Sequence, residues 1–376
     1  MRIDIIIVNY QSAADVVRCL DALGPWVAGT IWLVNNSAQE SGSTADTLAL
    51  TAKAQQRDDV RLLQADENLG FGRGCNLAYE QSNADVLILL NPDARIERRD
   101  LEKLVNVLVD EPDLGALSPA MFWNDGRSFL IPPSVAQTPA ASVGLVLSTR
   151  YAWLSRWLAA RELRHMRWLA QQPRCQQVSF LSGAVLIVRR SAAQEAAKRS
   201  GLPSTLLFDP DYFMFFEDTD LSLRLRRAGW RLGIHPGIFA VHEYRHKAYK
   251  AALMSTARAQ YFSKRFRWFY QITRKLGWLD RLARPLDTQQ RFACRLGRLH
   301  SALELAEKTG HAGVLALSPS LLTRPALFRP AHLAAAPLSQ DEWDLLEAGA
   351  YALLVQQPGG LTHWCHFERE DCSRLS

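Results

Sequence analysis

The chain has 376 residues, of which 48% are hydrophobic and 22% are charged, so it can bury the core of one large domain and an appended module. This composition excludes a disordered or fibrous protein. Apolar runs such as Ile5–Val8 and Val86–Leu90 are far too short to span a bilayer. The first residues, Met1-Arg2-Ile3-Asp4, lack the apolar core of a secretory signal, so we expect a cytoplasmic protein.

The spacing of the cysteines and the distribution of charge indicate the compartment of the protein and the kinds of ligand it suits. The 6 cysteines form no CxxC pair and no zinc-site pattern, which is typical of idle thiols in a reducing compartment. The formal net charge of +6 is unevenly spread, because the basic stretch from Arg245 to Arg298 contains only two acids, Asp280 and Asp287. Such a stretch suits nucleic acid, anionic lipid or a polyphosphate ligand.

Strands and helices alternate in the first part of the chain. The continuous apolar run Ile3–Val8 predicts a buried parallel strand, and Ser12 then begins a helix. Further strands are predicted at Ile31–Val34, near Val60–Leu63 and at Val86–Leu90, with helices up to about Gln56 and over Arg73–Gln81. This alternation predicts a doubly wound α/β sheet, whose ligands bind beyond the carboxyl ends of the strands.

The pattern changes after Leu117. Residues 123–140 are loop-like, and residues 141–172 form a helical stretch rich in arginine and tryptophan. A strand is predicted at Ala184–Val188, and Phe208–Asp220 leads into a helix closed by Gly229. Residues 311–376 have several prolines and weak periodicity, which indicates a small module of helical or irregular structure.

The first candidate site follows the strand Val86–Leu90. Pro92 cannot continue a central strand, so the chain leaves the sheet where Asp93 can face a cleft. A carboxylate at this place can bind Mg²⁺ or Mn²⁺ together with substrate phosphates. An ordinary Asx turn explains the same residues, so the motif alone leaves both interpretations open.

The second candidate site is the acidic start of the helix after Phe208–Phe216. Glu217 and Asp218 follow a dense aromatic run, which can exclude water and raise the pKa of a carboxyl group. One acid can then act as a general base while the other orients it. The alternative is that these acids have no catalytic role and only interact favourably with the positive end of the helix dipole.

Two weaker features accompany these acids. His242 follows the apolar run Ile238–Val241 and can ligate a metal, although a lone histidine is more often structural. The glycines of Asn68–Asn76 let backbone amides approach an anion at the start of a helix. Cys75 stands where a dinucleotide fingerprint needs its third glycine, and no Walker lysine is present, so a nicotinamide enzyme is disfavoured.

The order of these motifs resembles that of the family 2 glycosyltransferases, and among them the bacterial rhamnosyltransferase branch. The resemblance covers roughly residues 1–250 and rests on Val8-Asn9-Tyr10, Val34-Asn35-Asn36-Ser37, Asn68–Asn76, Leu89–Asp93, Ser182-Gly183-Ala184, Phe208–Asp220 and His242. It implies the GT-A fold, a Rossmann-like and mostly parallel α/β sheet flanked by helices.

The resemblance also implies a role for each matched residue. Asp93 takes the metal-binding place of the DxD motif, with Asn91 instead of its first aspartate, and His242 matches a later ligand of Mg²⁺ or Mn²⁺. Asp218 matches the catalytic base, with Glu217 beside it. The donor nucleotide is expected at Asn9, Tyr10, Asn35, Asn68, Gly70, Gly72, Asn76 and Asn91. Asn35 departs from the usual Asp, yet its amide can accept a hydrogen bond from a pyrimidine N3–H.

These assignments predict an inverting, metal-dependent glycosyltransferase. The expected donor is a nucleoside-diphosphate sugar, with dTDP-L-rhamnose as the first choice and a UDP- or GDP-sugar as the alternative. The expected acceptor is a hydroxyl of a lipid-linked glycan or polysaccharide of the cell envelope. A sugar-nucleotide-binding partner protein without turnover remains an alternative, but the Glu217-Asp218 pair counts against it. No helix-turn-helix, RNP or zinc pattern supports a nucleic-acid partner.

We expect a GT-A domain over residues 1–270, with a nucleotide-binding half (1–117) and an acceptor or catalytic half (118–270). A basic helical extension (271–310) and a small module of unknown role (311–376) follow. The segment Arg150–Trp168 fits an amphipathic helix on an anionic surface at the inner face of the cell membrane. It fits equally well a helix packed over the acceptor cleft, with its arginines in solvent.

Overall fold

The computed structural model describes residues 1–37, 44–133, 137–243, 249–275, 294–318, 327–330, 333–334, 336–357, 359–360 and 362–370. The basic segment Arg245–Arg298 lies partly outside these ranges. Within the described ranges, no helix has the length and apolar character needed to cross a bilayer.

The N-terminal strands form the parallel part of the sheet. Strand β1 (Ile3–Asn9) lies between β2 (Ile31–Asn35) and β4 (Val86–Leu90), and β3 (Val60–Gln64) pairs with β2. All of these pairs are parallel. Every residue of β1 and β4 is buried, which explains why Ile5–Val8 and Val86–Leu90 are continuously apolar and do not alternate.

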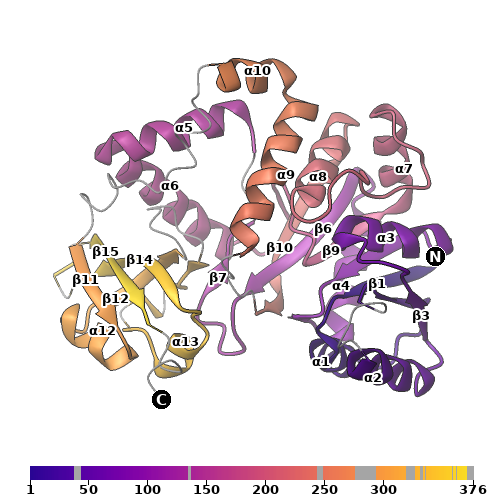
Figure 1. The fold of residues 1–376 in the computed structure, drawn as a ribbon, viewed down its shortest axis with the longest axis horizontal. Coiled ribbons are helices and arrows are strands. Elements are labelled where there is room, and N and C mark those ends of the chain that lie inside the picture. The colour runs from indigo at the N-terminus through magenta and orange to yellow at the C-terminus, as the bar shows by residue number, and fades with distance from the viewer. Residues whose placement is uncertain are drawn as a thin grey trace.

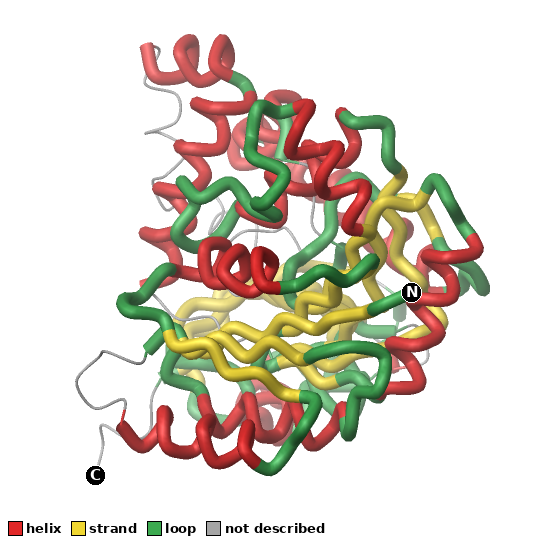
Figure 2. The backbone as a smooth tube through the Cα atoms, turned by 90° about the vertical axis from the view of Figure 1, so that its right-hand side faces the viewer, coloured by secondary structure: helices red, strands yellow, loops and turns green. Residues whose placement is uncertain are grey.

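Helices cover both faces of this sheet (Figures 1 and 2). On one face, α1 (Ala13–Leu23), α2 (Thr44–Gln55) and α4 (Arg98–Asp110) pack around Ile5 and Ile7. On the other face, α3 (Gly70–Gln81), α7 (Arg190–Arg199) and α8 (Glu217–Arg227) pack around Ile6 and Val8. The predicted α/β class, with a sheet flanked by helices, is confirmed.

Beyond β4 the sheet becomes mixed. Strand β9 (Val185–Arg189) lies antiparallel between β4 and β6 (Leu114–Phe122). Strand β10 (Arg231–His242) runs parallel to β6, and two short strands pair with it in the antiparallel direction: β5 (Ala94–Arg95) and β8 (Gln176–Gln177). The pairing of β5 places His242 opposite Ala94, next to the predicted metal ligand Asp93.

The C-terminal part contains strands that the sequence analysis does not predict. They are β11 (Cys294–Leu299), β12 (Gly313–Ser318), β14 (Gly349–Gln356) and β15 (Thr362–Arg369). They join the main sheet through β13 (Leu327–Phe328) and β7 (Leu130–Ile131). Strand β11 lies inside the segment 271–310, which was expected to be helical; there the described helices are the end of α10 (Arg267–Lys275) and α12 (Ala302–Lys308).

The missing strand signal in this module has a physical cause. Helices α12 and α13 (Gln340–Asp344) cover one face of its sheet, and α6 (Ala152–Ala170) covers the other (Figure 1). All residues of β12 are buried as a result. A strand that is buried on both faces has no alternation of apolar and polar residues, so its sequence cannot be told from a buried helix segment.

Helix α8, which carries the predicted catalytic acids, is anchored by a buried charge network. Asp220 accepts hydrogen bonds from Arg224 Nε at 2.7 Å and from Arg265 Nη2 at 3.0 Å. The Asp220 and Arg224 side chains are 0% and 1% exposed. Arg265 is the last residue of α9 (Tyr249–Arg265), so the network joins α8 to α9 and fixes the start of α8.

We predict that Asp220→Asn lowers the free energy of unfolding by about 3–5 kcal/mol, because it leaves the buried Arg224 guanidinium without a carboxylate and leaves Arg265 with Asp209 alone. Urea denaturation followed by circular dichroism measures this loss. The control is Asp21→Asn, since Asp21 pairs with Lys53 while 59% exposed and should change stability far less. Equal losses in the two variants would contradict the anchoring role of Asp220.

Candidate active site

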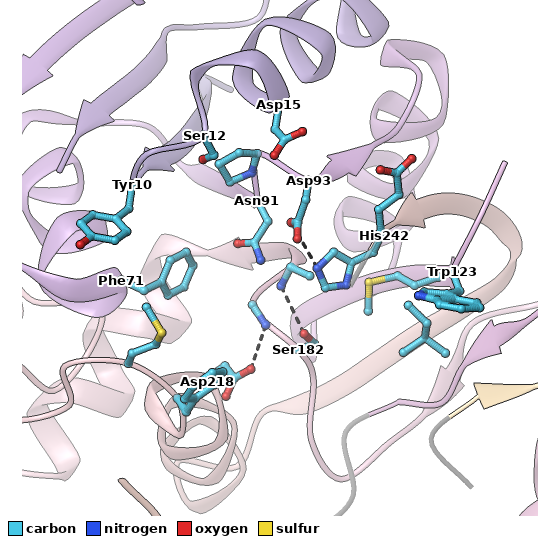
Figure 3. Close-up of a pocket in the computed structure, with 18 of the residues that line it drawn as sticks. Tyr10, Ser12, Asp15, Phe71, Asn91, Asp93, Trp123, Ser182, Asp218 and His242 are labelled. Atoms are coloured by element: carbon cyan, nitrogen blue, oxygen red, sulfur yellow. Dashed lines mark hydrogen bonds and ion pairs between the residues drawn. The ribbon is translucent and has the colours of Figure 1, made fainter. Parts of the chain in front are cut away.

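A cavity of about 610 Å³ opens at the carboxyl ends of β1 and β4. This is the edge at which a doubly wound sheet binds its ligands. The predicted site residues that line it are Tyr10, Asn68, Gly70, Asn91, Asp93, Glu217, Asp218 and His242. Figure 3 shows Asn91, Asp93 and Asp218 directed toward this one cavity.

The metal-ligand candidates meet at one side of the cavity. His242 Nε2 lies 3.3 Å from Asp93 Oδ1. The backbone reinforces this contact, because the N–H of Glu243 donates to Asp93 O at 3.1 Å. The side chain of Glu243 in turn accepts a hydrogen bond from Arg95 at 2.8 Å. The end of β10 is therefore tied to β5 by both backbone and side chains.

The donor atoms at this side fit a divalent cation. Asp93 supplies a carboxylate and His242 an imidazole, and both are ligand types that Mn²⁺ accepts. Asn91 Oδ1 is buried and has no hydrogen-bond partner among the described residues, so it is a further oxygen that a cation can satisfy. Mg²⁺ typically takes one or two carboxylates plus phosphates and waters. The described ranges contain no cluster of three or more His, Cys, Asp or Glu side chains that could hold a metal.

The two acids at the start of α8 have different surroundings. Asp218 Oδ2 accepts a hydrogen bond from Gly183 N at 3.0 Å, and Oδ1 accepts one from Thr219 N at 2.6 Å (Figure 3 shows the Gly183 contact). Glu217 Oε2 is buried and has no hydrogen-bond partner among the described residues. The residue before them, Phe216, has a φ of 67°, a left-handed conformation that is strained for a bulky side chain.

These surroundings set which acid holds a proton. Burial, followed by the charge of Asp218, raises the pKa of Glu217 to about 8. Burial also raises the pKa of Asp218, but the N–H groups of Gly183 and Thr219 oppose that rise. Since hydrogen bonds to a carboxylate favour its charged form, Asp218 is the acid that ionises first. Glu217 stays protonated near neutral pH.

The start of α3 does not present its amides to an anion in the way that the glycine pattern suggested. The N–H groups of Leu69 and Gly70 donate to Asn36 Oδ1 and Asn68 Oδ1 at 2.9 and 3.0 Å. The N–H of Phe71 donates to Phe213 O at 2.9 Å. Gly70 has a φ of 73°, and a Cβ there would lie 2.0 Å from Phe213 O. This glycine is required because the Phe213 loop packs directly against it.

Four residues predicted to bind the donor do not line the cavity: Asn9, Asn35, Gly72 and Asn76. Asn9 Nδ2 donates to Asn35 Oδ1 at 3.1 Å, and both side chains are fully buried. Asn76 Oδ1 accepts from Phe208 N and its Nδ2 donates to Phe208 O, each at 2.9 Å. A Cβ on Gly72 would lie 3.5 Å from that of Glu217. These residues hold the loops around the cavity in place and do not face it.

The cavity also has walls that sequence reasoning missed. Met121 and Trp123 come from the end of β6, and Asp15 comes from α1. The C-terminal module contributes Leu317, Leu327, Leu345, Leu346, Glu347 and Tyr351. Apolar residues of this kind are typical of any core, so no local pattern marks them as cavity walls. Other walls, such as Ser182, Gly183 and Ala184, did have a signal in the sequence, because they form one of the matched motifs.

Residues 1–271 match the family model described as glycosyltransferase like family 2. The chain belongs to this family. Its sheet is therefore the GT-A-like sheet that the motif order implied, and the cavity lies at the edge where such a sheet binds ligands. The matched region stops before the C-terminal module, which is an extension beyond the family's common part.

Relatives with curated names include two rhamnosyltransferases. The N-acetylglucosaminyl-diphospho-decaprenol L-rhamnosyltransferase of Mycobacterium tuberculosis is 30% identical over 223 residues, which are 56% of this chain and 66% of that protein. Rhamnosyltransferase WbbL of Escherichia coli is 28% identical over 211 residues, which are 54% of this chain and 68% of that protein. The matches thus span about two thirds of the relatives' length.

Solved structures with a similar backbone include the mannosyltransferase PcManGT from Pyrobaculum calidifontis in complex with GDP-Man and Mn²⁺. Its sequence is 18% identical, its TM-score is 0.45, and the match covers 71% of this chain and 63% of that one.

The high pKa of Glu217 predicts a pH-dependent stability. The pKa rises from 4.5 to about 8 on folding, so the stabilisation from the protonated form is full below pH 4.5 and is lost as pH rises through about 8. The variant Glu217→Gln has an uncharged side chain of the same shape as protonated Glu217. The melting temperature of this variant should therefore fall less than that of the wild type between about pH 6 and pH 9. The difference should reach a few kcal/mol by calorimetry.

The matched control for this prediction is Glu80→Gln, because Glu80 is an exposed residue of α3. Its melting temperature should follow that of the wild type at every pH. If Glu217→Gln also runs parallel to the wild type, Glu217 is ionised at neutral pH and the assignment of the proton is wrong.

Proposed function

We propose that this protein is an inverting, metal-dependent glycosyltransferase that moves L-rhamnose from dTDP-rhamnose to a hydroxyl of a glycan acceptor in cell-envelope synthesis. The observation that supports this most is that Asp93, His242 and Asp218 line one cavity in a chain of this family. The names of two relatives favour rhamnose, and one of them favours a lipid-linked acceptor. A UDP- or GDP-sugar remains the alternative donor.

The donor diphosphate is proposed to bind at Asn91, Asp93 and His242. A diphosphate and the Asp93 carboxylate repel each other, so a cation between them is the arrangement that electrostatics favours. Bound Mg²⁺ or Mn²⁺ supplies a Lewis acid that offsets the negative charge of the leaving diphosphate. Asp93 and His242 are the residues proposed to hold it. Tyr10 and Asn68 line the same cavity and are proposed to contact the nucleoside.

Asp218 is proposed to accept the proton of the acceptor hydroxyl. Its carboxylate is oriented by Gly183 N and Thr219 N, so its free lone pairs have a fixed direction. The hydroxyl oxygen forms the new bond to the anomeric carbon, and the bond to the diphosphate breaks on the opposite face with its electron pair. The configuration is therefore inverted. Glu217, protonated beside Asp218, keeps a second negative charge away from the departing anion.

The acceptor is proposed to lie toward the apolar end of the cavity. Trp123 and Tyr351 offer aromatic surfaces there, and Leu346 and Glu347 come from the C-terminal module. The acceptor half expected over residues 118–270 is thus proposed to extend into residues 311–376. A position at the inner face of the cell membrane belongs to the same proposal, since it gives access to a lipid-linked acceptor.

We predict that Asp218→Asn binds dTDP-rhamnose as the wild type does but loses at least about a hundredfold in turnover, since general-base help is worth about 10²–10⁴-fold. Equilibrium binding and single-turnover rates with a GlcNAc-containing lipid acceptor separate the two effects. Full turnover in this variant would falsify the role of Asp218. The control Asp211→Asn removes an exposed acid nearby and should leave turnover unchanged.

We predict that Asp93→Ala abolishes the metal-dependent part of donor binding. In calorimetry, the wild type should bind dTDP at least about tenfold more tightly with Mn²⁺ than with a chelator, and the variant should show no such difference. The control is Asp125→Ala, because the Asp125 side chain lies in the loop between β6 and β7 and is 76% exposed. Equal affinity of the wild type with and without Mn²⁺ contradicts metal dependence, whatever sugar is transferred.

A further inference from the structure

A second cavity, of about 420 Å³, lies across the sheet from the first. Successive residues of β6 point to opposite faces, and Met121 and Trp123 line the first cavity whereas Ala120 and Phe122 line the second. The same alternation occurs on β13, where Leu327 faces the first cavity and Phe328 the second. Ile131 of β7 lines both cavities, so they adjoin there, but neither Asp93 nor Asp218 lines the second cavity.

The walls of this cavity are apolar apart from three arginines and Gln171. Helix α6 supplies Leu163 and Met166, and β10 supplies Ile234 and Phe239. None of the residues that line the cavity is acidic. A pocket of this size and lining is typical of a small-molecule site, in which a few polar groups fix the orientation of a mainly apolar ligand.

The three arginines differ in how far they are neutralised. Arg329 Nη2 donates to Glu342 Oε2 at 2.6 Å, so its charge is compensated. Within the described part of the chain, Arg167 has no carboxylate partner, and its Nε is buried without a hydrogen-bond acceptor. The guanidinium of Arg127 also has no carboxylate partner there, and it lies 5.1 Å from the centre of the Phe239 ring. Arg127 is exposed to solvent at the cavity, whereas Arg167 Nε is buried and unsatisfied among its apolar residues, an arrangement that favours an anionic ligand.

The backbone at Arg127 supports a fixed position for this charge. Arg127 has a φ of 51°, a left-handed conformation that is uncommon for a residue with a long side chain. Its N–H donates to Asn124 O at 3.0 Å, and Asn124 Oδ1 accepts from Ser128 N at 3.0 Å. The loop between β6 and β7 is therefore built as a tight turn that directs Arg127 toward the cavity. Strained residues of this kind cluster at ligand sites.

The outer surface of α6 has the character of an interfacial helix. Trp153, Trp157 and Trp168 are 67%, 49% and 47% exposed. Arg161 lies over Trp157, with Cζ 5.2 Å from the ring centre, and Arg164 is exposed on the same helix. Tryptophan and arginine on one helix face are typical of contact with anionic lipid. The cavity lies under this helix, whose residues Leu163 and Met166 line it.

We propose that the second cavity binds an amphiphile, an apolar chain that carries an anionic phosphate headgroup. The phosphate headgroup lies at Arg127 and Arg167, and the apolar chain of the ligand packs between α6 and β10. This site does not depend on the proposed transfer reaction, because none of the residues that line it takes part in that reaction. Its ligand is recognised by charge at one end and by apolar contact along the rest.

The test uses three probes: dodecyl phosphate, dodecyl maltoside and inorganic phosphate, each below its micelle concentration where it has one. Calorimetry and native mass spectrometry should detect one dodecyl phosphate per chain. Dodecyl maltoside has the same tail without charge, and inorganic phosphate has the charge without a tail. Each should bind at least about tenfold more weakly than dodecyl phosphate.

Two variants test the position of the site. Arg167→Gln should weaken dodecyl phosphate at least about tenfold, whereas Arg164→Gln, on the outer face of the same helix, should not change its affinity. Ala170→Phe fills the cavity from an exposed position of α6, so it should block binding without disturbing the core. Circular dichroism checks that each variant is folded.

Several results would overturn the proposal. If dodecyl maltoside binds as tightly as dodecyl phosphate, the charge plays no part in binding. If inorganic phosphate binds as tightly as dodecyl phosphate, the alkyl chain plays no part. Unchanged affinity in Arg167→Gln places the ligand elsewhere. Competition by saturating dTDP with Mn²⁺ means that the probe occupies the first cavity. None of these results bears on the role of Asp218 in transfer, so the two proposals fail separately.

Discussion

The pairing of β5 with the last residues of β10 is the contact on which the candidate site depends. It places His242 opposite Ala94 and brings its imidazole within 3.3 Å of Asp93. Neither residue is a strong metal ligand alone, since one carboxylate holds a divalent cation only weakly without further donors. The backbone bond from Glu243 to Asp93 and the ion pair of Glu243 with Arg95 keep the two side chains together. Without this pairing, Asp93 would belong to a surface turn.

Charge is the second constraint on the cavity. A donor diphosphate is anionic, so each unpaired negative charge in the cavity would oppose its binding. Burial keeps Glu217 protonated, and the unsatisfied Asn91 oxygen offers a neutral donor atom beside Asp93. The two acids at the start of α8 thus differ in their surroundings, because backbone hydrogen bonds reach Asp218 whereas Glu217 Oε2 has no partner among the described residues. The buried Asp220 network fixes the helix that carries them both.

The C-terminal module contributes walls to both cavities. Its strands continue the main sheet, with residues that face the proposed acceptor end on one side and α6 on the other. Trp123 and Leu327 line the first cavity, and their neighbours Phe122 and Phe328 line the second. The two cavities therefore lie mainly on opposite faces of one sheet, and the carboxylates Asp93 and Asp218 line only the first. In an enzyme that acts on a lipid-linked acceptor, this arrangement would keep the reacting sugar and a bound amphiphile on different faces.

The sequence by itself determined the elements whose signals are local. The apolar runs of β1 and β4, the exit of the chain at Pro92 and the acidic start of α8 need only neighbouring residues, and they led to Asp93 and Asp218. The tertiary structure decided where polar side chains point. Asn9, Asn35 and Asn76 resemble ligand contacts in sequence but bond to buried neighbours, because an amide cannot be buried unpaired. It also decided the C-terminal strands and the meeting of His242 with Asp93, since burial on both faces removes periodicity and strand pairing joins residues far apart in the chain.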